Sequence, residues 1–260
     1  MELTPNEREG VAGIRSLIKE FLNGVEGTPQ VREYLSTVAK NESIMLIYLK
    51  GRKYRVNYAW ETLKINAEVR FNEYPEVFPE NPPIIGYRLQ AEGYGGILKA
   101  RDKFGRRIMC FNTAEWNPDE VSMDQLTASL TFLMDRLILD KDAINNGMLF
   151  LQNCDGFGWK HAKQYTLHAM KRHLNIFWYS YPIKFKGVYY VNCPSYVGYL
   201  YKMIKPFLKK KIQERIFILT KDKSFEMLHE KLPPKILPKF LGGDIENDRA
   251  LEILELQPIK

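Results

Sequence analysis

The amino-acid sequence predicts an α/β protein in which a small helical domain, residues 1–80, precedes a domain with a mainly parallel sheet, residues 84–250. Three observations support this division. Apolar residues recur at helical spacing early in the chain, whereas short apolar runs of strand length alternate with helical stretches later. Between the two regions, four prolines fall within residues 72–83, where they block helix continuation and indicate a linker or an irregular crossing.

The helical domain is predicted from amphipathic spacing. In residues 11–22, Val11, Ile14 and Ile18 recur three or four positions apart and form one apolar face. Pro29 precedes a second helical stretch. Further helices are expected around residues 44–48 and over residues 58–65.

The second region alternates between strands and helices. Strand–helix–strand repeats of this length form right-handed crossovers, so neighbouring strands are expected to run parallel. The expected strands are 107–112, 148–152, 188–191 and 216–219, and the expected helices are 126–139, 159–177, 196–214 and 223–231.

Composition narrows the class of protein. The chain is 45% apolar and carries 15 Tyr, 14 Phe and 4 Trp, which is too many core-forming side chains for a disordered protein. Its cysteines, Cys110, Cys154 and Cys193, lie far apart, a spacing that argues against a disulfide scaffold and favours a reducing compartment. The amino-terminal residues lack the pattern of a signal peptide. We therefore expect a cytoplasmic protein that visits membrane surfaces only transiently.

The sequence contains none of the common catalytic or nucleotide-binding signatures, neither GxGxxG, GxxxxGK[ST], GxSxG nor HExxH. Cys154, Asp155 and His161 lie close in sequence, but a nucleophilic site needs a geometry that proximity alone does not supply. We therefore expect no enzyme activity, no cofactor and no metal site.

The positive charge of the chain is concentrated in one segment. Residues 182–221 hold nine of the 38 Lys and Arg residues but only one acid, Glu214. Period-two geometry sends Lys184 and Lys186 to one face of a strand, and Lys211 and Arg215 lie one helical turn apart. An anionic membrane surface or a nucleic acid fits such a patch, and so does a solvated face over a core. We expect no nucleic-acid partner.

Residues 196–215 combine an apolar stripe with lysines. Val197, Leu200 and Ile204 lie at helical spacing, and Pro206 breaks the hydrogen-bond ladder and starts a second helical piece. The pattern indicates a hinged helix with one apolar face. An ordinary core helix with a solvated side fits the same residues.

Five motifs in order, spread over residues 10–245, resemble the CRAL-TRIO (Sec14-like) lipid-binding family. Residues 48–54 (YLKGRKY) are similar to a motif of that family's amino-terminal helical domain, and residues 148–156 (MLFLQNCDG) to its strand followed by Asp-x-x-Gly. Residues 181–194 (YPIKFKGVYYVNCP) resemble its proline–lysine strand. Residues 203–215 (MIKPFLKKKIQER) look like its lid helix and the segment after it, and residues 237–243 (LPKFLGG) like its closing motif. The subgroup that binds tocopherol and retinaldehyde is the most similar.

This resemblance implies a twisted sheet that floors an apolar cavity, which a mobile helix covers. Gln152 is either a ligand anchor or a wall group that a neighbour satisfies. The implied pocket residues are Ser129, Phe132, Leu133, Met148, Phe150, Gln152, Ile176, Phe177, Ile183, Val188, Val197, Leu200, Tyr201, Ile204, Phe207 and Leu208.

The resemblance also implies a phosphoinositide headgroup site at Lys184, Lys186, Lys211 and Arg215, with Lys50 contributing from the helical domain. The expected function is that of a soluble carrier, which exchanges a tocopherol-, retinoid- or other isoprenoid-like lipid at phosphoinositide-containing membranes. A phosphatidylinositol or phospholipid transfer protein and a phosphoinositide-recruited signalling adaptor remain alternatives.

Overall fold

A computed structural model describes residues 3–80 and 94–252 and contains one five-stranded sheet within these ranges. Strand β1 (Gly95–Ile97) pairs antiparallel with β2 (Arg107–Asn112), and β2, β3 (Met148–Asn153), β4 (Phe185–Cys193) and β5 (Ile216–Thr220) follow in parallel. The prediction of an α/β protein with a mainly parallel sheet is confirmed.

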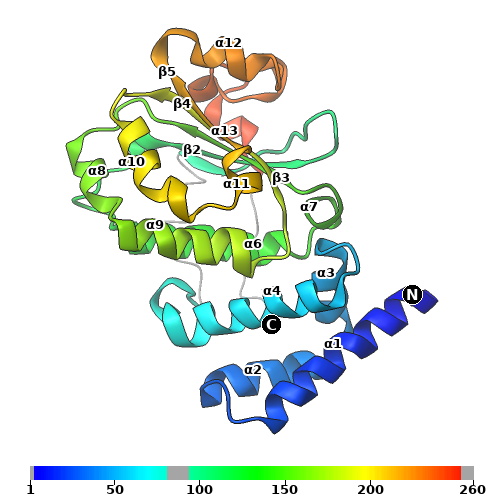
Figure 1. The fold of residues 1–260 in the computed structure, drawn as a ribbon. Helices are drawn as coiled ribbons and strands as arrows, with labels where there is room; N and C mark the ends of the chain where they lie inside the picture. The colour runs from blue at the N-terminus through cyan, green and yellow to red at the C-terminus, as the bar shows by residue number, and fades with distance from the viewer. Residues whose placement is uncertain (1–2, 81–93, 253–260) are drawn as a thin grey trace.

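The strands lie in the sheet in the order in which they occur along the chain. Right-handed crossovers between such neighbours place every connecting helix on the same face of the sheet. These connections are α6 (Met123–Leu137), α7 (Lys141–Asn146), α8 (Trp159–Gln164), α9 (Leu167–His173), the π-helix η4 (Leu174–Ser180), α10 (Val197–Ile204), the 3₁₀ turn η5 (Lys205–Phe207) and α11 (Lys210–Gln213). Figure 1 shows α6, α9 and α10 together on one side of the strands.

The opposite face of the sheet packs against the carboxy-terminal elements, α12 (Ser224–His229) and α13 (Asn247–Ala250) among them (Figure 1). Because strand side chains alternate between faces, Leu149 and Leu151 of β3 join Leu228 and Leu241 in this core. The strand neighbour Phe150 points instead toward the helices of the crossover face. The two faces of the sheet therefore belong to different hydrophobic clusters.

The helical domain consists of α1 (Pro5–Asn23), α2 (Pro29–Lys40), α3 (Glu42–Gly51) and α4 (Val56–Glu68). Each of the first three begins at a polar cap, Thr4, Thr28 or Asn41, whose side chain accepts a hydrogen bond from the first turn of the helix. Their apolar faces meet in a core that is separate from those of the sheet. This agrees with the helices predicted from apolar spacing.

The proline-rich segment is not a free linker in the part that the structure describes. After the π-helix η1 (Val69–Glu73) and the 3₁₀ turn η2 (Pro75–Val77), Val77 and Phe78 are buried in the main core of the sheet domain. Residues 81–83 of that segment lie outside the described residues. The boundary between residues 80 and 84 stays a prediction.

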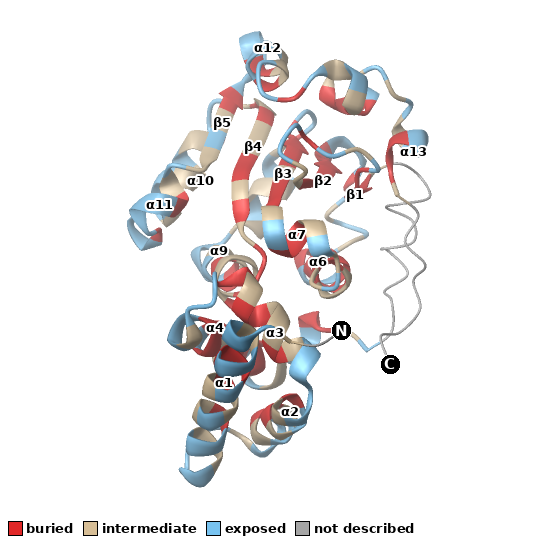
Figure 2. Ribbon diagram, turned by 90° about the vertical axis from the view of Figure 1, so that its right-hand side faces the viewer, coloured by how far each residue is buried: buried red, intermediate tan, exposed pale blue. Residues whose placement is uncertain are grey.

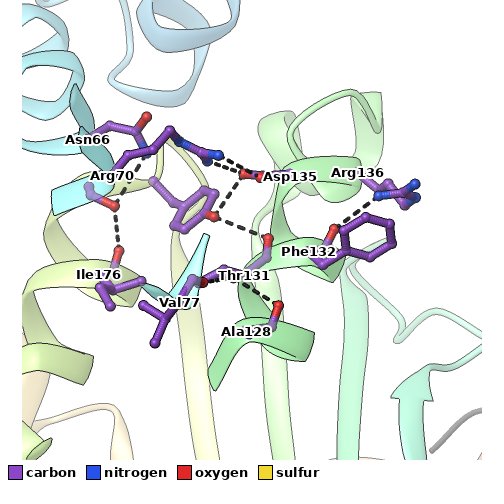
Figure 3. Close-up of polar contacts among 11 residues, drawn as sticks. Asn66, Arg70, Val77, Ala128, Thr131, Phe132, Asp135, Arg136 and Ile176 are labelled. Carbon is purple, nitrogen blue, oxygen red and sulfur yellow. Dashed lines mark hydrogen bonds and ion pairs between the residues drawn. The ribbon is translucent and has the colours of Figure 1, made fainter. Parts of the chain in front are cut away.

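A polar network joins the two regions (Figure 3). Arg70 of η1 forms a two-pronged ion pair with Asp135 of α6, with N–O distances of 3.0 and 2.5 Å. The Tyr181 hydroxyl donates to the same carboxylate at 2.8 Å, and Thr131 donates to the Val77 carbonyl. Figure 3 shows Arg70 beside Asp135 and Val77 beside Thr131, so the helical domain is tied to the crossover face of the sheet domain.

Two expected helices are divided. The predicted helix at 159–177 consists of α8, α9 and η4, because Thr166 interrupts it and caps α9 through the Ala169 amide. The predicted helix at 196–214 consists of α10, η5 and α11, with Pro206 in the turn between the helices. No sequence pattern predicted β1, α7 or α13, which are only three to six residues long.

Candidate functional site

A cavity of about 240 Å³ lies between the crossover face of the sheet and the helices that cover it. This is just below the usual volume of small-molecule pockets, roughly 300–1,000 Å³. Among the residues that the structure describes, twenty-six line the cavity, and none of these is Lys, Arg, Asp or Glu. Four of the lining side chains are methionines, and they are Met109, Met123, Met134 and Met170.

The floor consists of two rows of side chains that cross four strands. Strand register aligns Phe150 with Met109 on one side and with Val188 and then Ile216 on the other. Two positions further along, the second row contains Phe111, Gln152, Tyr190 and Ile218. Both rows face the cavity because side chains two positions apart share one face of a strand.

Helices form the walls and the roof. One wall is the face of α6 that carries Met123, Leu126, Leu130 and Met134, and the other is α9 with η4. Residues 197–213, which we call the roof segment, close the top. Its inward side chains in the lining are Val197, Leu200, Tyr201, Ile204 and Leu208.

The outer surface of the roof segment is partly apolar and carries lysines, and much of α10 and α11 is intermediate or exposed in Figure 2. Tyr199 is 68% exposed, Met203 46% and Phe207 45%. The Lys171 ammonium lies 4.0 Å above the Phe207 ring, and the Lys202 ammonium lies 5.2 Å from the Tyr199 ring. Exposed aromatic side chains beside cations suit the boundary between water and lipid headgroups.

The few polar groups of the lining are mostly engaged. Gln152 donates from Nε2 to Thr113 Oγ1 at 2.9 Å. His173 Nε2 lies 2.8 Å from Thr127 Oγ1. Burial and, after it, the positive charge of Arg172 lower the pKa of His173 to about 4, so its imidazole is neutral at physiological pH. Burial likewise raises the pKa of the Tyr165 and Tyr190 phenols.

Nine of the sixteen expected pocket residues line this cavity. They are Phe150, Gln152, Phe177, Val188, Val197, Leu200, Tyr201, Ile204 and Leu208. For Gln152, the structure shows a wall group whose amide is bonded to Thr113.

The other seven expected residues do not line the cavity. Ser129, Phe132 and Leu133 lie on α6 but are absent from the lining. Phe207 points outward from the roof segment. Met148, Ile176 and Ile183 are buried in the adjoining core cluster, as is Leu133.

Several lining residues were not predicted from the sequence. On α6 these are Met123, Leu126, Leu130 and Met134, which recur at helical spacing. That spacing identifies the face of α6 that lines the cavity, whereas matching to a family motif did not. His173 gave no such signal, because nothing in the sequence pairs it with Thr127, 46 positions earlier.

A cationic cluster lies where β4 and β5 begin. Burial and, after it, the nearby charges of Arg52, Lys186, Lys53 and Lys211 lower the pKa of Lys184 to about 8. The pKa of Lys186 is also lowered by burial, and then by Arg215, Lys53, Arg106 and Lys211. The structure thus brings together Lys184, Lys186, Lys211 and Arg215, as the sequence analysis expected.

Over the residues that the structure describes, no carboxylate forms an ion pair with these four cations. Arg215 donates to the Phe185 carbonyl at 2.7 Å. Lys50 was expected to join the cluster, but its ammonium forms an ion pair with Glu7 at 3.1 Å. The cations that the helical domain places near Lys184 are Arg52 and Lys53.

The structure gives structural roles to the groups that resembled a nucleophilic site. Asp155 forms an ion pair with Lys221, and His161 is hydrogen-bonded to Gly158 and Trp116 on its two ring nitrogens. The Cys154 thiol is buried, and its pKa is raised. No group of three or more metal-ligating side chains occurs within residues 3–80 and 94–252. In the same ranges, no helix is both long and apolar enough to cross a bilayer.

Comparisons with known proteins agree with this geometry. Residues 91–243 match the CRAL/TRIO domain family. The chain is 28% identical over 225 residues to clavesin-1 of Rattus norvegicus, and the alignment covers 83% of this chain and 62% of that protein. It is 29% identical over 214 residues to the human alpha-tocopherol transfer protein-like protein, and the alignment covers 82% of this chain and 61% of that protein.

The crystal structure of Sfh5 has the same fold, with a TM-score of 0.55 at 13% identity over 99% of this chain and 95% of Sfh5. The chain spans about three fifths of the length of the curated relatives it matches, 62% for clavesin-1. The matched domain extends over more than half of the residues and includes every strand of the sheet. The chain therefore belongs to the CRAL/TRIO family of lipid-binding and lipid-transfer domains.

Proposed function

We propose that the protein is a non-enzymatic carrier that holds one hydrophobic lipid in the cavity and exchanges it at phosphoinositide-containing membranes. The observation that supports this most directly is the apolar cavity under a roof segment whose far end, at Lys211, belongs to the cationic cluster. We assign it no catalytic step.

The lining favours an apolar lipid over a phospholipid whose headgroup is buried inside. A phosphate in the cavity would need cationic or several donor partners, and the lining contains no charged side chain. A lipid that loses about 500 Å² of apolar surface gains up to about 12 kcal/mol at about 25 cal/mol/Å². Unaided release into water is therefore slow, and exchange needs the roof segment to open at a membrane.

The cationic cluster supplies the membrane contact in this proposal. Four cations near an anionic leaflet contribute roughly 4 kcal/mol, enough for brief visits but too little for permanent attachment. Lys184 and Lys186 repel their cationic neighbours, and a phosphoinositide headgroup relieves that repulsion. Lys211 and Arg215 flank the end of the roof segment, so headgroup binding there pulls directly on the cover of the cavity.

We expect the charge reversal Lys211→Glu with Arg215→Glu to slow lipid transfer to vesicles that contain phosphatidylinositol bisphosphate by at least about tenfold. Lipid binding in solution should stay nearly unchanged, because neither residue lines the cavity. The measurement is fluorescence transfer of a lipid probe between vesicles with and without the phosphoinositide.

The matched control is Lys19→Glu with Lys40→Glu, which makes the same change in net charge at exposed positions of α1 and α2. Transfer by the control should remain near that of the unmodified chain. Equal transfer rates for the unmodified chain and the Lys211 and Arg215 variant would remove the phosphoinositide step from the proposal. Mass spectrometry of lipid extracted from the purified protein distinguishes an apolar lipid from a phospholipid.

A further inference from the structure

His173 is a polar residue in the wall of the cavity, and its hydrogen bond to Thr127 determines which ring nitrogen carries the proton. It belongs to α9 and lines the cavity beside Met170, Leu174 and Phe177. Its Nε2 atom lies 2.8 Å from the hydroxyl oxygen of Thr127 on α6. One wall helix is thereby bonded to the other through this pair.

The Thr127 hydroxyl determines which ring nitrogen of His173 carries the proton. Thr127 Oγ1 lies 2.6 Å from the Met123 carbonyl oxygen, which has no hydrogen to give, so the hydroxyl hydrogen points to that carbonyl. A hydroxyl has one hydrogen, so Thr127 can only accept from His173. The Nε2 atom is therefore the protonated nitrogen, and Nδ1 of the neutral ring has a free lone pair.

No described residue hydrogen-bonds His173 Nδ1. Such an acceptor in an apolar wall pairs best with a group that donates a hydrogen bond, and an unmade bond there costs free energy. The other polar groups of the lining differ in kind. The Gln152 amide already donates to Thr113, and the phenols of Tyr165 and Tyr190 can donate as well as accept, so they do not distinguish an alcohol from a lipid without a donor.

We propose that His173 Nδ1 accepts a hydrogen bond from the hydroxyl group of the bound lipid, and that the cavity thereby selects lipid alcohols over lipids without a donor. This inference rests on the proposed function as a lipid carrier and specifies its ligand class. Fatty acids are disfavoured as well, because a carboxylate would find no cation in the lining.

The test compares two fluorescent isoprenoid probes, retinol and the hydrocarbon in which hydrogen replaces its hydroxyl group. Dissociation constants are measured for the unmodified chain and for His173→Phe, which removes the acceptor but keeps a planar ring. For each protein we take the ratio of the two dissociation constants. The two probes differ in hydration, and this difference cancels when the ratios for the two proteins are compared. We expect His173→Phe to reduce the preference for retinol about tenfold, the effect of one buried hydrogen bond.

The matched control is His168→Phe, the same substitution at an exposed position of the same helix, which should leave the ratio unchanged. If His173→Phe does not fold, Thr127→Val provides the second variant. It keeps the imidazole but removes the hydroxyl that fixes its tautomer, so the preference for retinol should fall as well. Nitrogen NMR of the unmodified chain should show an unprotonated Nδ1 whose resonance shifts when retinol is added.

An unchanged ratio in His173→Phe overturns the inference, as does a preference lost in Tyr190→Phe but kept in His173→Phe. An Nδ1 resonance that retinol does not move overturns it too. These results leave the carrier function intact, since both probes still bind. Failure of both probes to bind the unmodified chain contradicts the proposed carrier function itself.

Discussion

Lys184 and Lys186 combine burial with crowding by like charges, and both effects lower the pKa of an ammonium group. Lys184 has a pKa of about 8, so part of its population is neutral at mildly alkaline pH. An anion binds the protonated form. If the cationic cluster binds a phosphorylated headgroup as proposed, its affinity is therefore linked to pH in a range where isolated lysines stay charged.

We expect binding to vesicles that contain phosphatidylinositol bisphosphate to weaken as pH rises through about 8. Below that pH, Lys184 is protonated and binding is at its maximum. Above it, Lys184 loses its charge, and Lys186, whose pKa is also lowered, follows. Vesicle co-sedimentation between about pH 7 and about pH 9 measures the change.

Lys184→Arg is the control, because a guanidinium stays charged throughout this range. This variant should bind at the higher pH nearly as well as at the lower one. If the unmodified chain bound equally across the whole range, Lys184 would have no part in the headgroup contact.

The residue scale also marks the limit of what the sequence could predict. Period-two spacing placed Lys184 and Lys186 on one face, and helical spacing placed Lys211 near Arg215, so local periodicity sufficed for the cluster. Lys50 was matched by motif, yet its partner Glu7 lies in another helix. His173 depends on Thr127 in the same way. Contacts between distant segments carry no local signal.

Among the elements, the sheet has two different faces: one borders the cavity, and the other packs against the core of the carboxy-terminal elements. Val188 in β4 faces the cavity, whereas Val191, three positions on, is fully buried in the opposite core. A phenylalanine in place of Val188 would extend its ring into the cavity. A phenylalanine in place of Val191 would overpack a dense core, which typically lowers the free energy of unfolding by about 1–3 kcal/mol.

We expect Val188→Phe to abolish or strongly reduce binding of a lipid probe while leaving the free energy of unfolding nearly unchanged. Val191→Phe should lower the free energy of unfolding by about 1–3 kcal/mol. Urea unfolding and probe titration on both variants measure the two effects. A large destabilisation by Val188→Phe would mean that the cavity is closed in solution.

The strands were the most predictable elements, because their apolar runs are short and bounded by turns. All four expected strands are present, and β4 extends beyond the expected 188–191 at both ends. The helix expected at 159–177 was harder, since its apolar spacing continues across Thr166. The cap competes with helix continuation, and only tertiary packing decides between them.

At the scale of the whole molecule, Arg52 joins the helical domain to the sheet domain. It is 4% exposed and donates to Thr62 Oγ1 at 2.8 Å, to the Pro182 carbonyl at 2.9 Å and to the Tyr181 carbonyl at 2.6 Å. Gly51 allows this approach, because a Cβ atom there would lie 2.4 Å from the Pro182 oxygen. The two regions therefore pack closely at this point.

We expect Arg52→Ala to lower the free energy of unfolding by about 2–4 kcal/mol, because two buried carbonyls lose their partner. The two regions should also unfold less cooperatively, giving separate transitions in denaturant. Circular dichroism and tryptophan fluorescence, followed through the same titration, measure this separation. Arg55→Ala, at an exposed position of the same turn, should change neither quantity, and coincident transitions in Arg52→Ala would show that the other contacts suffice.

The four methionines of the cavity lining bear on the empty state of the proposed carrier. Unbranched thioether chains rotate about three bonds at little cost and adapt to irregular spaces. In that proposal, Met109, Met123, Met134 and Met170 can rearrange into part of the volume that a departing lipid leaves. The same adaptability lets one cavity accept lipids of differing outline.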